Sequence, residues 1–89
     1  MKINENFVLK TIAGEAVVMP VGEAVSKVNG MIKLNPTAEV IWKALEKETD
    51  FESVINEVKA NCDGVDEATL SDDVTAFIEK LKKLGILEE

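Results

Sequence analysis

The chain has 89 residues, of which 46% are hydrophobic, and its formal charge of −7 comes from 17 acids against 10 lysines. This length suits one domain over residues 1–89 with a single core, and the apolar fraction argues against disorder. Because the chain has no histidine and one cysteine, the common ligand sets for zinc, haem and iron–sulfur clusters and the histidine-based nucleophiles are excluded. The negative charge and the lack of arginine disfavour a nucleic-acid-binding surface.

Targeting and membrane segments are not evident in the sequence. No apolar run approaches the roughly 20 residues that span a bilayer, and the mixed polarity of residues 1–10 does not fit a signal peptide. A single cysteine, Cys62, rules out an internal disulfide and suits a reducing compartment. We therefore expect a cytoplasmic protein that has no cofactor, does not contact a membrane and is not an enzyme.

The first third of the chain favours β-strands. Residues Phe7–Ala13 are rich in β-formers, and Gly14–Glu15 predicts a turn into a second strand over Ala16–Val21. A loop is expected over Gly22–Lys27, followed by a third strand over Val28–Leu34. In that third strand, alternation puts Val28, Ile32 and Leu34 on one face and Asn29, Met31 and Lys33 on the other.

A first helix is predicted over about Pro36–Lys47. Asn35 can cap this helix, and Pro36 stands in its first turn, where a missing N–H costs nothing. One apolar face, with the single tryptophan at its centre, is formed by Ala38, Ile41, Trp42 and Leu45. We expect Trp42 to be a core residue.

Two further helices are predicted. Thr49 and Glu52 have the spacing of a capping box, and the helix that they introduce has an apolar face of Phe51, Val54, Ile55 and Val58. After a loop at Asn61–Val65, a third helix begins between Asp66 and Ser71, where several residues could cap it. Gly85 predicts the end of this helix. The apolar stripe of the helix comprises Leu70, Val74, Phe77, Ile78, Leu81 and Leu84.

The order of three strands and three helices predicts an α+β domain. A three-stranded antiparallel sheet has two open edges, which a small protein must cover or use. On a helical wheel, Asp73 and Lys80 flank the stripe of helix three beside Phe77. If that flank overlooks the third strand, the two elements form an apolar groove that suits an extended peptide added as a fourth strand. The alternative is that a loop covers the edge.

The other candidates for chemistry have ordinary structural explanations. The acids Asp66, Glu67, Asp72 and Asp73 could hold a divalent cation, but acids near a helix N-terminus are favoured by the helix dipole. Cys62 could be a reactive thiol, yet a small apolar residue after helix two is the simpler interpretation.

The sequence resembles the family of pyrroloquinoline quinone biosynthesis protein D (PqqD), the peptide chaperones also called RiPP recognition elements. The resemblance extends from about Phe7 to Leu87. It rests on the order and spacing of Leu34-Asn35, Thr37-Ala38, Ile41-Trp42, Leu45, the Phe51–Val58 helix, Asp73-Val74, Phe77, Leu81 and Leu84-Gly85-Ile86-Leu87.

The resemblance implies a winged-helix-like domain and a role in natural-product biosynthesis. Family members bind the leader of a ribosomally made precursor peptide as a strand beside the third strand, against the third helix. They thereby present the peptide to a modifying enzyme, often a radical SAM protein. Carried over to this chain, the peptide-binding residues are Asn29, Gly30, Met31, Ile32 and Lys33 of the strand and Asp73, Phe77, Lys80, Leu81 and Leu84 of the helix.

Two other functions are compatible with the sequence. A winged-helix transcription regulator has the same elements, but it needs a basic recognition helix, whereas helix three mixes its lysines with acids. A regulatory or dimerising subunit without peptide cargo is the third possibility. We expect a monomer or a weak homodimer that does not bind nucleic acid.

Overall fold

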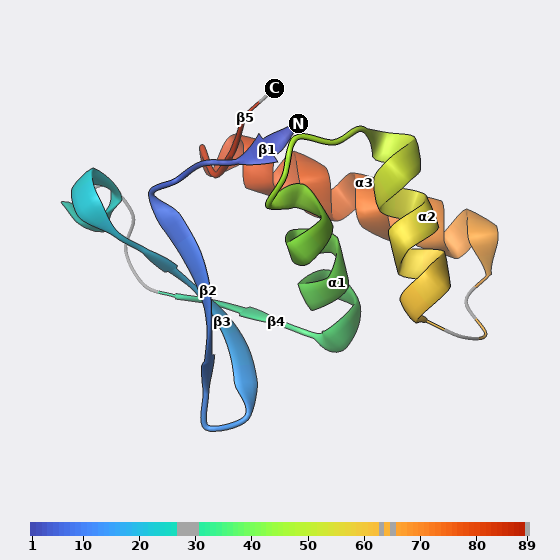
Figure 1. The fold of residues 1–89 in the computed structure, drawn as a ribbon, viewed down its shortest axis with the longest axis horizontal. Helices are drawn as coiled ribbons and strands as arrows, with labels where there is room; N and C mark the ends of the chain where they lie inside the picture. Colours follow the sequence, from blue (N-terminus) through green and yellow to red (C-terminus); the bar gives the residue numbers. More distant parts are fainter. Residues whose placement is uncertain (27–30, 63, 65, 89) are drawn as a thin grey trace.

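The computed structural model of the chain describes residues 1–26, 31–62, 64 and 66–88. In this part of the chain, a three-stranded antiparallel sheet is followed by three helices, which confirms the predicted α+β fold class. The longest helix runs behind the other two helices in Figure 1, and the main sheet lies to one side of it, near the end that leads to the C-terminus.

The main sheet has the order β2-β3-β4, with β2 at Phe7–Ile12, β3 at Glu15–Pro20 and β4 at Ile32–Leu34. The β2–β3 turn lies at Ala13–Gly14 and not at Gly14–Glu15 as predicted. Both turn residues have positive φ, 53° for Ala13 and 81° for Gly14. This combination is typical of a type I′ turn, whose twist matches that of the two strands.

The segment between the hairpin and β4 differs from the prediction. A 3-10 helix, η1, forms at Gly22–Ser26 where a loop was predicted. Its Ala24 is 5% exposed and belongs to the core, so burial of this side chain holds the segment against the sheet. The first half of the predicted third strand, including Asn29 and Gly30, lies outside the described residues.

A second, two-stranded sheet joins the two ends of the chain and was not predicted. β1 at Lys2–Ile3 pairs antiparallel with β5 at Leu87–Glu88. Ile3 and Leu87 stand opposite each other, and each is 7% exposed. Strands of two residues are too short to show a period in the sequence, and their pairing depends on contacts between distant segments.

Helix α1 spans Pro36–Leu45 and begins as predicted. The side chain of Asn35 accepts a hydrogen bond from the amide of Ala38 at 2.8 Å, which confirms the N-cap. Ile41, Trp42 and Leu45 are at most 2% exposed, so the tryptophan is a core residue. The helix ends at Leu45, two residues before the predicted end.

Helix α2 spans Phe51–Asn61, but its predicted cap was wrong. The side chain of Asp50, and not that of Thr49, accepts the hydrogen bond from the amide of Ser53, at 2.8 Å. The amide of Thr49 donates instead to the carbonyl of Met1 at 3.0 Å. The helix thus starts one residue later than the predicted cap implied.

Helix α3 spans Glu67–Lys83, with Asp66 as its N-cap. At its end Gly85 adopts a φ of 74°, its amide donates to Lys82, and the amide of Ile86 donates to the carbonyl of Leu81 at 2.9 Å. These two bonds form a Schellman motif, which confirms the predicted stop at Gly85. Four residues of the predicted stripe are buried in the core, namely Leu70, Val74, Ile78 and Leu81.

Candidate functional site

The edge of the main sheet at β4 is the first component of the candidate site. On one side β4 pairs with β3, with Ile32 opposite Val18 and Leu34 opposite Ala16. Among the described strands, none pairs with the other side of β4. The backbone groups of this outer edge are thus available to an added strand.

The two faces of β4 differ in character, as the alternation predicted. Ile32 and Leu34 are half-buried and pack against the hydrophobic core. Lys33 is exposed on the opposite face, where its Nζ atom lies 3.2 Å from a carboxylate oxygen of Glu15. Met31, just before the strand, is 58% exposed. A strand added beside β4 would therefore have one face toward the core and helices and the other toward Lys33 and solvent.

A depression of about 370 Å³ between α1 and α3 is the second component. It adjoins the end of β4, because its first lining residue, Asn35, directly follows Leu34. Three residues predicted from the sequence, Asp73, Phe77 and Lys80, line it together from α3. The remaining lining residues come from the start of α1 and from α3, and they are Asn35, Thr37, Ala38, Ile41 and Ala76.

The floor of this depression is apolar and its α3 rim is charged. Phe77 is half-buried and packs against the core, although its central place in the predicted stripe suggested full burial. Asp73 and Lys80 are exposed on either side of it along the helix. Within the described part of the chain, neither of these two side chains makes an ion pair.

The other two predicted helix residues lie elsewhere. Leu81 is 1% exposed and belongs to the core, so it has no surface for a peptide in this structure. Its place in the predicted apolar stripe agrees with this burial, whereas its assignment to the peptide site came from the family resemblance alone. Leu84 is 41% exposed and lines a separate hollow of about 210 Å³, together with Phe7 and Ala24.

The contribution of α1 to the depression was missed in the sequence. Thr37 and Ala38 lie one turn before Ile41, and all three line the depression from α1. The small side chains of Ala38 and Ala76 leave the space that makes the depression. In the sequence, the small residue Ala76 beside Phe77 could have indicated a depression on α3. Its partner on α1, Ala38, becomes evident only when the two helices are packed.

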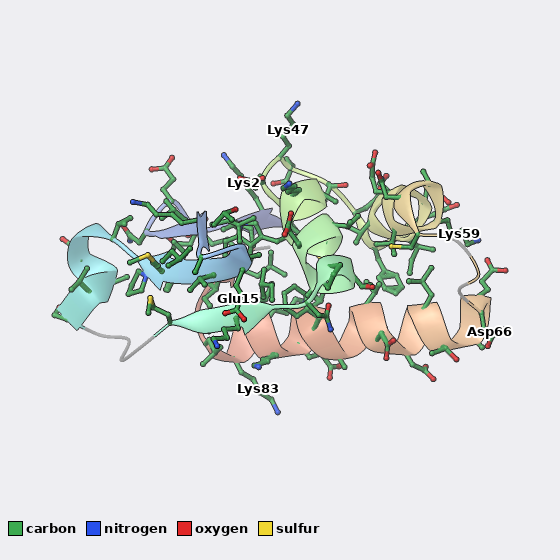
Figure 2. All side chains as sticks on the ribbon, turned by 90° about the horizontal axis from the view of Figure 1, so that it is seen from below. Lys2, Glu15, Lys47, Lys59, Asp66 and Lys83 are labelled. Carbon is green, nitrogen blue, oxygen red and sulfur yellow. The ribbon has the colours of Figure 1, made fainter. Side chains whose placement is uncertain are left out.

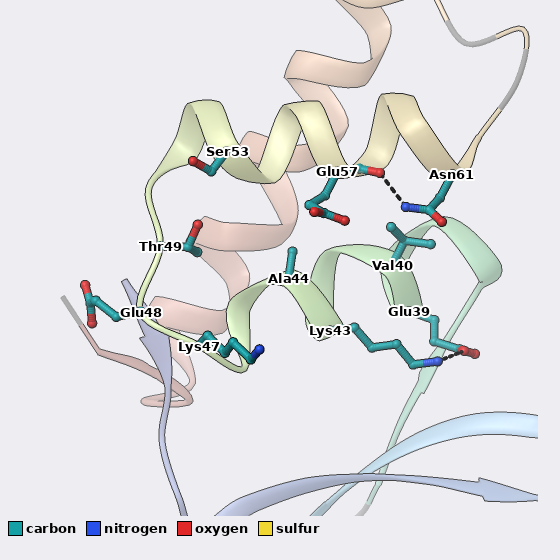
Figure 3. A pocket seen from close by; sticks show the side chains of 10 residues that line it. All are labelled: Glu39, Val40, Lys43, Ala44, Lys47, Glu48, Thr49, Ser53, Glu57 and Asn61. Atoms are coloured by element: carbon teal, nitrogen blue, oxygen red, sulfur yellow. Dashed lines mark hydrogen bonds and ion pairs between the residues drawn. The ribbon is translucent and has the colours of Figure 1, made fainter.

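A larger hollow, of about 560 Å³, lies on the other side of α1, between α1 and α2 (Figure 3). It contains none of the residues predicted to bind a peptide, and three of its five charged side chains are in ion pairs. Lys43 pairs with Glu39 at 3.0 Å, and Glu48 pairs with the N-terminal ammonium group at 2.8 Å. Its floor of Val40 and Ala44 is small. This crevice between two helices offers less for recognition than the edge of β4 does.

Two of the four acids considered for cation binding, Asp66 and Glu67, have structural roles. Asp66 caps α3 by accepting a hydrogen bond from the backbone amide of Thr69 at 3.4 Å, and Glu67 pairs with Lys59. No group of three potential metal ligands occurs among the described side chains. Cys62 is half-buried against the core.

None of the helices in the described ranges is both long and apolar enough to cross a membrane.

Comparisons with known proteins agree with this geometry. Residues 15–87, which include β4 and the whole depression, match the sequence model of the family of coenzyme PQQ synthesis protein D. The fold is similar to the solved structure of TbiB1 in complex with the TbiA(beta) leader peptide, with a TM-score of 0.76 and 25% sequence identity. That similarity covers 99% of this chain and 95% of the other. None of the curated proteins matches the chain.

Proposed function

Because this chain belongs to the family of coenzyme PQQ synthesis protein D, we propose that it binds the leader segment of a ribosomally made precursor peptide. One observation carries the proposal: the outer edge of β4, unpaired among the described strands, adjoins an apolar depression on α3. The similarity in fold to a protein solved with a leader peptide supports it.

In the proposed complex, the leader extends the main sheet as a strand beside β4. Its backbone exchanges hydrogen bonds with the outer edge of Ile32–Leu34, and these bonds supply affinity without regard to sequence. Its inward side chains contact the surface formed by Ile32 and Phe77, and they supply selectivity. Asn29 and Gly30 remain proposed contacts by family resemblance, whereas Leu81 supports the floor from within the core.

The protein acts as an adaptor in this proposal, and another protein catalyses the reaction. The chain has no histidine for acid–base work, and its one cysteine is half-buried against the core. We propose that the leader-bound protein presents the precursor to a radical SAM or other peptide-modifying enzyme in the cytoplasm. Family membership and the single unpaired cysteine support these two assignments.

The test is an NMR titration of the isotope-labelled protein with the synthetic leader of a precursor peptide encoded beside its gene. We expect saturable binding, with chemical-shift changes concentrated at Ile32–Leu34 and around Phe77, and little change at Val40 in the α1–α2 crevice. A scrambled peptide of the same composition is the control. Binding that perturbs the crevice and leaves β4 unchanged would contradict the proposed mode, and no binding of any neighbouring leader would contradict the function.

A further inference from the structure

Two opposite charges border the apolar floor of the α1–α3 depression. Asp73 and Lys80 are separated by two turns of α3, which corresponds to about 10 Å along the helix. Phe77 lies between them. Since neither charge makes an ion pair among the described residues, both are available to a bound molecule. The rim therefore has a polarity, negative at one end and positive at the other.

The direction of this polarity relative to β4 follows from the fold. Figure 2 shows β4 above the end of α3 that carries Lys83, while the Asp66 end extends beyond α1. β4 leads from that end toward α1, so that β4 and α3 run in opposite directions. A peptide that follows the direction of β4 meets Lys80 before Asp73, and a peptide that runs antiparallel to β4 meets Asp73 first.

The spacing of the two charges limits the peptide. In a strand, residues that share one face are two apart, and four residues span about 13 Å. This length exceeds the separation of the two rim positions by about 3 Å, which the long side chain of Lys80 can bridge. A spacing of two residues would leave no inward side chain between the charges to contact Phe77. A cation and an anion four residues apart, with an apolar residue midway, fit both the rim and the floor.

We propose that this depression selects peptide segments with the pattern basic residue, any residue, apolar residue, any residue, acidic residue, in that N-to-C order. The order assumes the antiparallel arrangement, which is the more common and slightly more stable one for strand pairs. The basic side chain then lies at Asp73, the apolar one on Phe77 and the acidic one at Lys80. The inference rests on the proposed function and names the class of leader segment that the protein accepts.

The test is a display selection of random dodecapeptides on the wild-type protein and on the charge-reversed variant Asp73→Lys/Lys80→Glu. The wild type is expected to enrich the stated pattern, and the variant the same pattern with its two charges exchanged. A matched control is Glu39→Lys/Lys43→Glu in the α1–α2 crevice, which also keeps the net charge and should enrich the wild-type pattern. Resynthesised wild-type winners should bind the Asp73/Lys80 variant about fivefold or more weakly, and the loss should shrink as salt rises.

The outcomes separate this inference from the proposed function. The selected peptides could require Phe77 and β4 yet show no order of charges, or show the same order on the wild type and on the Asp73/Lys80 variant. Either result would overturn this inference and leave the proposed function intact. A reversed order on the wild type would overturn it too, because it would require a parallel strand. Failure to enrich any peptide, or enrichment of peptides that bind away from β4, would contradict the proposed function and the inference together.

Discussion

Ile32 of β4 lies directly opposite Val18 of β3, in a ladder that occupies one edge of β4. Val18 is 2% exposed, so this side of the pair is part of the core. On the other edge, none of the described strands is paired with β4. Neighbouring residues of a strand direct their N–H groups to opposite edges, which makes the two edges separable by substitution.

Proline in place of Ile32 and of Lys33, one at a time, tests strand addition. Because proline lacks an N–H, one variant loses a donor to β3 and the other a donor to the outer edge. The variant that loses its hydrogen bond to β3 should lose stability. The variant that loses its donor at the outer edge should still unfold cooperatively on heating, yet bind the leader peptide about tenfold or more weakly. Unchanged affinity in both variants, each shown to be folded, would rule out pairing at this edge.

Truncation of Phe77 to alanine tests the floor of the depression. Because the side chain is half-buried, we expect a loss of about 2 kcal/mol of stability, less than for a fully buried phenylalanine, together with weaker leader binding. Val40→Ala is the matched control, since Val40 is also half-buried but lines the α1–α2 crevice. It should lower the melting temperature without changing affinity. Equal losses of affinity in the two variants would indicate a general effect of stability.

The protein is expected to show no salt-sensitive binding to DNA. The lysines of α3 stand in its last turn, while Glu67, Asp72 and Asp73 occupy its first half. With a net charge of −7 and no arginine, few phosphates can be neutralised. An electrophoretic mobility shift at low micromolar protein and physiological salt would contradict this expectation and favour a transcription regulator.

The N-cap of α2 predicts a loss of stability in acid. Hydrogen bonds from the backbone amide and the hydroxyl of Ser53 hold the pKa of the Asp50 carboxyl below its ordinary value. The folded state therefore favours the charged form, which stabilises the protein above the unfolded pKa of about 4, and this contribution disappears as pH falls through the folded pKa.

Asp50→Asn separates the charge of this cap from its geometry, because asparagine caps a helix about as well. The variant should resemble the wild type near neutral pH and lose less stability between pH 5 and about pH 3. The measurement is thermal unfolding across that range. Parallel pH profiles for the two proteins would show that the carboxylate has no such role.

Gly85→Ala tests the Schellman motif at the end of α3. No atom lies within 4 Å of where the new Cβ would stand, so the expected cost comes from the backbone, whose φ is 74°. We expect a loss of about 1 kcal/mol, or roughly 4–8 °C in melting temperature. Gly85→Asn should lose less, because asparagine tolerates this conformation better. A melting temperature unchanged in the alanine variant would show that the motif contributes little.

Local sequence signals were sufficient for much of the fold and for part of the site. The Asn35 cap, the Gly85 stop and the burial of Trp42 are each determined within one or two helical turns, where spacing in the sequence fixes proximity in space. For the same reason, Asp73 and Lys80 could be assigned to one flank of a helix, beside Phe77, before the partners of that helix were known. The predicted groove depended on these short-range relations.

Other features were decided only by the tertiary structure. The pairing of Ile3 with Leu87 joins opposite ends of the chain, and the backbone amide of Thr49 donates to the carbonyl of Met1, which is distant in the sequence. Burial of Leu81 and the contribution of α1 to the depression depend on how whole helices pack. The local sequence specifies which side chains share a face of a helix or strand. The burial of these faces against one another then decides which distant segments become neighbours, because the core must be close-packed.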